Sequence, residues 1–411
     1  MGGGAFMQAS AQGEPTLNTP RMSPGEYRTL KQHYLTKLQQ YFPTGKVVCL
    51  TEAPEKTDYG DIDIFVAVDK RVNFIDVANY LGATGVIYHS SKKAQKCTMA
   101  VPKDLVPSSR PVVEYKHIDM NNDRKPEVSS APVSREEYAQ IDVEIVHPEL
   151  LEWYTFYSSY GDLVGLLGRI VKNLWFTTSD RGFWLRMKEL DYSKTVDDPK
   201  QVMSFLGLSV EKYDAGFRTL DEMYAWIGAC RLLSVEAIKV KRDNASERYK
   251  EKKRTIFTKF FKEWLPAHMD MDLAEDEEEW NAKLQQLRQM HLEEAIDFFS
   301  IREEYNVKHN AIVLQMNNAM AASLLKPFIT QHSGRADKQL TEIMRAFRRY
   351  VGVDASGNPY VLRRPHADVE SQLHLLLGED FESLADPKGT SEWVKEHWEE
   401  LRSLERQRVK A

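Results

Sequence analysis

The chain has 411 residues, of which 42% are hydrophobic and 28% are charged, a composition typical of a folded soluble protein with two or three domains. We expect no membrane-spanning helix, because no run of roughly 18 apolar residues occurs, and no secretory signal, because the start lacks a basic and an apolar region. The formal net charge of −6 argues against a protein that coats nucleic acid over its whole surface, and three scattered cysteines exclude a disulfide framework and favour a reducing, cytoplasmic or nuclear location.

The first predicted elements are a disordered tail and a well-capped helix. Residues 1–22 are rich in Gly, Ser, Gln and Pro, a composition typical of disorder. The sequence Ser23-Pro24-Gly25-Glu26 then has the form of a capping box, with Ser at the N-cap and Glu three residues later. One face of the helix that follows is apolar and consists of Tyr27, Leu30, Tyr34, Leu38 and Tyr41.

Short strands and one short helix are predicted next. A polar loop over residues 51–58 separates a first strand from a second one that begins at Asp61. Residues 102–134 carry five prolines and mixed charges, and we interpret most of this stretch as a long excursion between strands. The other elements predicted here are the strand Lys46–Leu50, the helix Phe74–Leu81, the strand Gly85–Tyr88 and an extended segment at Pro111–Tyr115.

A strand with an acidic face is predicted after the excursion. Residues 140–146 alternate apolar and acidic side chains, a pattern typical of a half-buried strand. Asp142 and Glu144 therefore lie on one face of it. Just before this strand, Ser134 to Glu137 forms a second possible capping box.

The second half of the chain is predicted to be mostly helical. The predicted helices are Pro148–Tyr157, Asp162–Leu174, Leu220–Val240, Ser246–Trp264, Glu279–Tyr305, Ala311–Phe328 and Glu392–Arg408. Two further strands are predicted at Gly182–Met187 and, after a turn at Asp354–Pro359, at Tyr360–Arg363. The expected fold class is α+β, a small mixed sheet domain followed by a mostly helical C-terminal half. The expected divisions are the tail 1–22, an α+β domain 23–190, a helical domain 191–330 and a small helical region with a short hairpin, 331–411.

The most informative residues are two aspartates at the mouth of an apolar strand. Asp61 and Asp63 begin the run Asp-Ile-Asp-Ile-Phe-Val-Ala, and residues two apart on a strand project from the same face. Adjacent carboxylates repel each other, and burying them is costly unless a cation lies between them. The pair therefore predicts a site for a divalent metal ion of the kind used in phosphoryl and nucleotidyl transfer.

The order of these elements resembles the nucleotidyltransferase superfamily of the DNA polymerase β type: a helix, a strand, a loop, a strand with Asp-x-Asp and a later acidic strand. The resemblance covers roughly residues 26–190. It implies a mixed sheet on which Asp61, Asp63 and Asp142 hold Mg²⁺ (or Mn²⁺) and an NTP such as ATP, with Asp142 serving partly as the base for the acceptor hydroxyl. Glu144 has the same face as Asp142 and is an alternative third carboxylate.

The expected phosphate-binding residues depart from the family pattern. Members of this family usually end the first strand with Gly-Ser, whereas this chain has Cys-Leu-Thr-Glu at residues 49–52. Thr51 would then supply a hydroxyl and Lys56 a positive charge, while Gly60 sits beside the aspartate pair. Glu52, in contrast, would repel phosphate.

Basic side chains further along the chain give two more expectations. The resemblance implies that Arg169 and Lys172, in the helix after the third carboxylate, face the nucleotide. Residues 239–262 contain ten Lys or Arg against three acids, and residues 263–279 contain eight acids and no Lys or Arg. The basic run is a candidate for contact with RNA or DNA, although a solvated helix face would show the same composition.

The sequence supports three functional hypotheses. The first is an Mg²⁺-dependent enzyme that moves a nucleoside monophosphate from an NTP to a hydroxyl of an RNA end, a protein or a small molecule. The second is an inactive nucleotidyltransferase fold that acts as a binding or scaffold protein, which the missing Gly-Ser favours. The third, ranked lowest, is a glycosyltransferase with an Asp-x-Asp motif, because only a short segment precedes Asp61.

Overall fold

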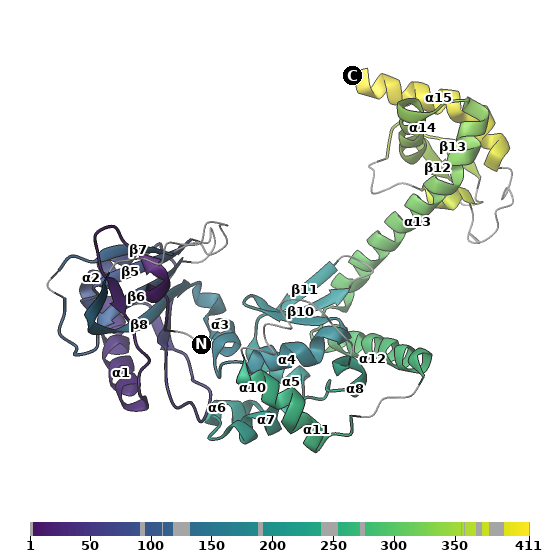
Figure 1. Cartoon of the computed structure of the whole chain (residues 1–411). Helices are drawn as coiled ribbons and strands as arrows, with labels where there is room; N and C mark the ends of the chain where they lie inside the picture. Colours follow the sequence, from purple (N-terminus) through teal and green to yellow (C-terminus); the bar gives the residue numbers. More distant parts are fainter. Residues whose placement is uncertain are drawn as a thin grey trace. The chain divides into compact units, whose positions relative to one another are not determined.

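The computed structural model divides the chain into two compact units (Figure 1). Unit 1 comprises residues 1–186 and 193–295, and unit 2 comprises residues 187–192 and 296–411. The main boundary therefore lies near residue 296, whereas the sequence predicts boundaries at 190 and 330. The residues whose structure is described are 3–90, 95–108, 110–117, 132–187, 192–239, 254–271, 276–354, 356, 358–366, 372–377 and 390–410.

An eight-stranded mixed sheet forms the centre of unit 1. Its strand order is β1-β7-β5-β6-β8-β4-β3, with β2 paired to β8. The strands are β1 (Ala9–Ser10), β2 (Thr16–Asn18), β3 (Lys46–Cys49), β4 (Asp61–Ala67), β5 (Gly85–Ser90), β6 (Gln95–Pro102), β7 (Val113–His117) and β8 (Val133–Val146). Strand β8 lies between β4, which is parallel to it, and β6, which is antiparallel to it. The strands predicted at residues 46, 61, 85 and 140 are confirmed.

Helices α1 (Pro24–Tyr41) and α2 (Phe74–Leu81) contribute the hydrophobic core on one face of this sheet. The predicted capping box begins α1: Ser23 Oγ accepts a hydrogen bond from the Glu26 N–H, and Glu26 Oε2 accepts one from the Ser23 N–H. The apolar face of α1 packs against Ile62, Ile64 and Val66 of β4. Because side chains alternate along a strand, the odd-numbered residues of β4 project from the opposite face.

The N-terminal segment is ordered, contrary to the predicted disorder of residues 1–22. Phe6 is fully buried and its ring meets Tyr115 edge to face, with 5.5 Å between the ring centroids. Strands β1 and β2 pair with β7 and β8, and Leu17 is buried in the same small cluster as Phe6. The Gly-rich composition conceals these contacts because its apolar residues occur singly, without a helical or strand period.

We expect Phe6→Ala to destabilise the protein by about 3–5 kcal/mol, the usual cost of truncating a buried Phe. The change would be measured by denaturant unfolding of the full chain. Met7→Ala is the control, because the neighbouring Met7 side chain is 52% exposed. Equal effects of the two substitutions would contradict a packed N-terminal segment.

Two strands of the sheet differ from the sequence prediction. The supposed capping box at Ser134–Glu137 lies inside β8, where Ser134 Oγ accepts from the Glu136 N–H instead. Pairing with β2 and β6 outweighs the local helix-start signal. Strand β6 was not predicted, although residues 97–101 are all buried.

The rest of unit 1 is mainly helical. Helices α3 (Leu151–Ser158) and α4 (Leu163–Val171) follow β8, and a three-stranded sheet is formed by β9 (Phe176–Ser179), β10 (Gly182–Met187) and β11 (Tyr192–Val196). The predicted helix 220–240 is interrupted: α7 spans Leu220–Gly228 and α8 spans Val235–Ile238. Ser234 causes the restart, since its Oγ caps the Ala237 N–H. The further helices are α5 (Pro199–Phe205), α6 (Val210–Ala215), α10 (Thr255–Lys259), a π-helical turn (Phe260–Trp264), α11 (Leu265–His268) and α12 (Glu277–Phe298).

In its described residues, unit 2 consists of helices and one hairpin. Its elements are α13 (Arg302–Ser333), α14 (Asp337–Tyr350), β12 (Val351–Val353), β13 (Pro359–Val361) and α15 (Thr390–Lys410). The predicted hairpin and final helix are confirmed, whereas the break between long helices falls at residues 299–301 rather than near 306–310. The fold is thus α+β with a helical C-terminal half, as the sequence predicts. No described helix is both long and apolar enough to cross a membrane.

Candidate metal centre

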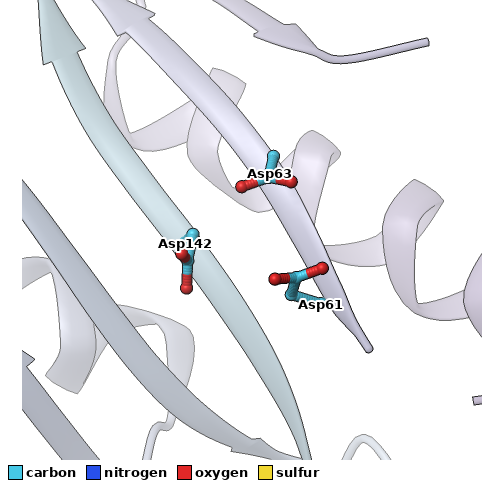
Figure 2. Close-up of side chains that lie close together, drawn as sticks. All are labelled: Asp61, Asp63 and Asp142. Carbon is cyan, nitrogen blue, oxygen red and sulfur yellow. The ribbon is translucent and has the colours of Figure 1, made fainter. Parts of the chain in front are cut away.

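The parallel pairing of β4 and β8 brings three aspartates together. In this register Asp63 lies opposite Asp142, and Asp61 lies opposite Gln140. One carboxylate oxygen from each of Asp61, Asp63 and Asp142 lies within 4.8 Å of the others, and Figure 2 shows the three side chains between the two strands. All three side chains are partly buried. The arrangement could hold a metal ion, because clustered carboxylate oxygens are typical ligands of hard divalent cations.

The cluster raises the pKa of the two aspartates on β4. Burial, followed by the charges of Asp61 and Asp142, raises the pKa of Asp63 to about 7. Burial and then Asp142 also raise the pKa of Asp61, an effect that the charge of Lys56 opposes. Without a cation, the site therefore favours protonation of at least one of its carboxyl groups near neutral pH.

Asp142 is held by three polar contacts that the sequence analysis missed. Thr98 Oγ1 and Gln140 Nε2 donate to Asp142 Oδ1 over 2.8 and 3.0 Å, and Lys96 Nζ lies 3.2 Å from Oδ2. Thr98 in turn lies 2.8 Å from His89 Nε2. Lys96 and Thr98 could have been found from the alternation of polar and apolar residues along 96–99, which is the pattern of a strand.

The cation beside Asp142 leads to a prediction about pH. Burial alone would lower the pKa of Lys96, but Asp142 and Asp63 outweigh it and raise that pKa. Lys96 in return lowers the pKa of Asp63. We expect Lys96→Met to raise the Asp63 pKa further, so that Mn²⁺ binding begins at a higher pH, because a metal binds the deprotonated ligand.

The measurement for Lys96→Met is calorimetric titration with Mn²⁺ at a series of pH values. Lys70→Met is the matched control, since Lys70 is exposed and follows β4 at its far end from Asp61. A midpoint that stays unchanged or moves to lower pH would contradict the expected role of Lys96.

Glu144 does not join the three aspartates. It lies two residues beyond Asp142 on the same face of β8, opposite Phe65 of β4 and Lys96 of β6. Burial raises the pKa of Glu144, and Lys96 opposes that effect. The register thus selects Asp142 as the partner of the pair on β4, and Glu144 faces an apolar neighbour instead.

The loop before β4 is folded around an ion pair. Lys56 Nζ pairs with Glu52, whose second oxygen accepts a hydrogen bond from the Tyr27 hydroxyl at 2.9 Å. Thr51 is exposed, and its backbone carbonyl oxygen accepts from the Tyr160 N–H. Gly60 is buried beside Gly3. The charge of Lys56 therefore lowers the pKa of Asp61, while its ammonium group forms an ion pair with Glu52.

Of the two predicted nucleotide-facing cations after β8, Arg169 has a structural partner. Arg169 Nη2 donates to the carbonyl oxygen of Ile238 at 3.0 Å, which joins α4 to α8. Lys172 begins the 3-10 turn Lys172–Leu174. A side chain at Gly168 would meet Thr178 Oγ1 of β9 at 2.5 Å, so close packing explains that glycine.

Most of the basic run at 239–262 lies outside the described residues. In its described part, Lys239 Nζ donates to the carbonyl oxygen of Met271, and Arg254 Nη1 lies 2.6 Å from Asp162 Oδ1. Phe257 and Phe260 are buried. The described aromatic side chains of this run therefore include core residues.

The face of the sheet that carries the aspartates also borders a hollow. Phe65 and Ala67 of β4 share this face with Asp61 and Asp63 and pack against Leu151 of α3. Beside them lies a cavity of about 280 Å³. Its walls come from β3, α3, α5 and α6 and include Val48, Leu151, Phe156, Met203 and Tyr213. The helices thus leave open space on this face of the sheet.

No protein-family model matches the chain, and no curated protein matches it either.

Proposed function

We propose that the protein is an Mg²⁺-dependent nucleotidyltransferase, which moves a nucleoside monophosphate from an NTP to a hydroxyl acceptor. The observation that supports this most strongly is the cluster of Asp61, Asp63 and Asp142 on two adjacent parallel strands, with oxygens within 4.8 Å of one another. Such an arrangement is costly without a cation, as the raised pKa of Asp63 indicates. The carboxylate oxygens suit Mg²⁺ or Mn²⁺.

Each residue of the cluster has a distinct place in this proposal. Asp61 and Asp63 would hold the metal ion, and Asp142 would hold it and accept the proton of the acceptor hydroxyl. Thr98 and Gln140 orient the Asp142 carboxylate for this task. Bound Mg²⁺ would supply Lewis acidity toward the triphosphate and the attacking hydroxyl.

A scaffold protein without activity is the second candidate. The observation in its favour is the Lys56–Glu52 ion pair, because it engages the expected phosphate-binding cation and places a carboxylate in the loop where phosphates would lie. A glycosyltransferase is less favoured. Such enzymes generally place a parallel βαβ unit before the Asp-x-Asp motif, whereas β3 and β4 here are antiparallel neighbours.

The test is turnover and self-labelling with radiolabelled ATP, GTP, CTP and UTP in the presence of Mg²⁺ or Mn²⁺, with and without bulk RNA. We expect a signal for the wild type that disappears in Asp61→Ala/Asp63→Ala. No signal together with no metal-dependent NTP binding in calorimetry would reject the enzyme and favour the scaffold. Binding without turnover would direct the search to the missing acceptor, which is an RNA end, a protein or a small molecule.

A further inference from the structure

Helix α14 of unit 2 has one buried and one fully exposed face. Its apolar residues Leu340, Ile343, Ala346, Phe347 and Tyr350 lie in the core of unit 2. The opposite face carries Lys338, Thr341, Arg345 and Arg348, and all four are exposed. Their spacing of three, four and three residues aligns them in one stripe along the helix.

The flank of α14 toward α15 is closed by ion pairs. Glu342 accepts from Arg402 and Arg406, both at 2.9 Å, and Arg349 lies 2.6 Å from Glu405. These contacts fix the rotation of α14 against α15. The stripe is consequently held toward solvent rather than being free to turn inward.

The segment after the hairpin adds two more cations near the end of α14. The Leu362 N–H donates to the Tyr350 carbonyl oxygen at 2.8 Å, and the His366 N–H donates to that of Arg349 at 2.7 Å. Arg363 and Arg364 lie between these anchors and are exposed.

Five cations of this surface have no counter-ion in the part of the chain that the structure describes. Among the described residues, no carboxylate lies within ion-pair distance of Lys338, Arg345, Arg348, Arg363 or Arg364, although most other arginines of unit 2 are paired. Two exposed acids lie near these cations in the sequence: Asp337 begins α14, and Asp354 lies in the hairpin turn, where its Oδ1 accepts from two backbone N–H groups. In a chain with a net charge of −6, so many unpaired cations on one surface require a polyanionic partner or high solvation.

The arrangement of the helices and the hairpin indicates which class of polyanion fits this surface. Helices α13 and α14 are joined by the short turn 334–336, which begins with Gly334 at a positive φ of 60°, and the hairpin β12–β13 follows α14 directly (Figure 1). Helix-turn-helix motifs, whose second helix enters the major groove of DNA, join their helices by such a short turn with glycine, a connection that other helical hairpins share. That groove is about 12 Å wide and admits a helix, whereas the major groove of duplex RNA is too narrow.

We propose that α14 and residues 362–366 form a binding surface for duplex DNA. Lys338, Arg345 and Arg348 contact phosphates on either side of the groove, and Thr341 lies between them toward the base edges. Arg363 and Arg364 extend the contact to the adjoining backbone. The stripe contains no aromatic side chain that would stack on unpaired bases, which favours a duplex over a single strand. The surface belongs to unit 2 and is independent of the carboxylates of unit 1.

The test is fluorescence anisotropy of the full chain with a labelled DNA duplex of mixed sequence, over a series of salt concentrations. We expect Arg345→Gln/Arg348→Gln to weaken binding at low salt about tenfold or more and to reduce the slope of log affinity against log salt by about two, since each of the two substitutions removes one phosphate contact. Lys70→Gln/Arg71→Gln is the control, because it removes two exposed charges from a loop of unit 1. Thermal unfolding checks that both variants are folded.

Three results would overturn the proposal: no binding of the duplex by the wild type, equal losses in the two double variants, or tighter binding of duplex RNA or single-stranded DNA than of duplex DNA. Asp61→Ala/Asp63→Ala should bind the duplex as the wild type does. The absence of nucleotidyl transfer would therefore not contradict duplex DNA binding, and the absence of DNA binding would not contradict nucleotidyl transfer.

Discussion

Asp142→Asn is expected to abolish metal-dependent nucleotidyl transfer, whereas Glu144→Gln is expected to retain most of it. Both residues lie on the same face of β8, but only Asp142 is opposite Asp63 and within the cluster. The loss in Asp142→Asn should exceed the roughly 10–100-fold cost of changing a residue that only orients a metal ligand. The measurement is the initial rate of labelled NTP turnover at saturating Mg²⁺.

Thr98→Val gives an intermediate case in the same assay. It keeps the shape of the side chain and removes the hydroxyl that donates to Asp142 Oδ1. We expect a loss of about 10–100-fold, since Gln140 still donates to the same oxygen.

Equal losses in Asp142→Asn and Glu144→Gln would show that the third ligand is misassigned, and full activity in both would remove the site from the reaction.

Asp63→Asn is expected to stabilise the metal-free protein at pH 8 by a few kcal/mol. Folding raises the Asp63 pKa from its ordinary value of 3.8 to about 7, so ionising this group disfavours the folded state. At about 1.4 kcal/mol per pKa unit, the gain has a ceiling of about 4 kcal/mol. The amide of Asn would also donate a hydrogen bond to a neighbouring carboxylate instead of repelling it.

The size of the stabilisation by Asp63→Asn depends on pH. Below about pH 4 the carboxyl is protonated in both the folded and the unfolded chain, so the advantage of Asn disappears. It grows as the pH rises and is complete above pH 7, where Asp63 is ionised in both states. Denaturant unfolding at pH 4, 6 and 8 in the presence of a chelator would measure it.

Two comparisons make the Asp63→Asn measurement decisive. Asp69→Asn is the control, because the Asp69 side chain is 86% exposed and its replacement should change stability by less than about 0.5 kcal/mol. Saturating Mg²⁺ should reduce the difference, since at a hundred times Kd it would add about 2.7 kcal/mol to the wild type alone. A less stable Asp63→Asn at pH 8 without metal would contradict the repulsion inferred for the cluster.

The sequence was sufficient for elements with strong local signals. The Ser23–Glu26 capping box and the apolar face of α1 are encoded within a few turns of helix, and both are present in the structure. The Asp61/Asp63 pair and the alternation through Asp142 predict two acidic strands. The register of β4 and β8 places Asp142, rather than Glu144, beside Asp61 and Asp63, and the sequence of a single strand does not encode that register.

The elements that were missed depend on long-range contacts. Phe6 and Leu17 are buried only because β7 and β8 lie beside the N-terminal segment, and no local period marks them. The Ser134–Glu137 motif is a sound helix start in isolation, but pairing of β8 with β2 determines its conformation. Lys96 and Thr98 reach the site because β6 is the antiparallel neighbour of β8.

The close approach of Gly3 to Gly60 has a practical consequence for protein engineering. A side chain at Gly3 would collide with the backbone of Gly60, which immediately precedes Asp61. Two residues later, the Ala5 N–H donates to Gln140 Oε1, and Gln140 donates in turn to Asp142. A side chain at position 3 or a proline at position 5 would thus affect both sides of the carboxylate cluster without altering any reactive group. Expression designs should keep Gly3 and Ala5 as they are and place affinity tags at the other end of the chain.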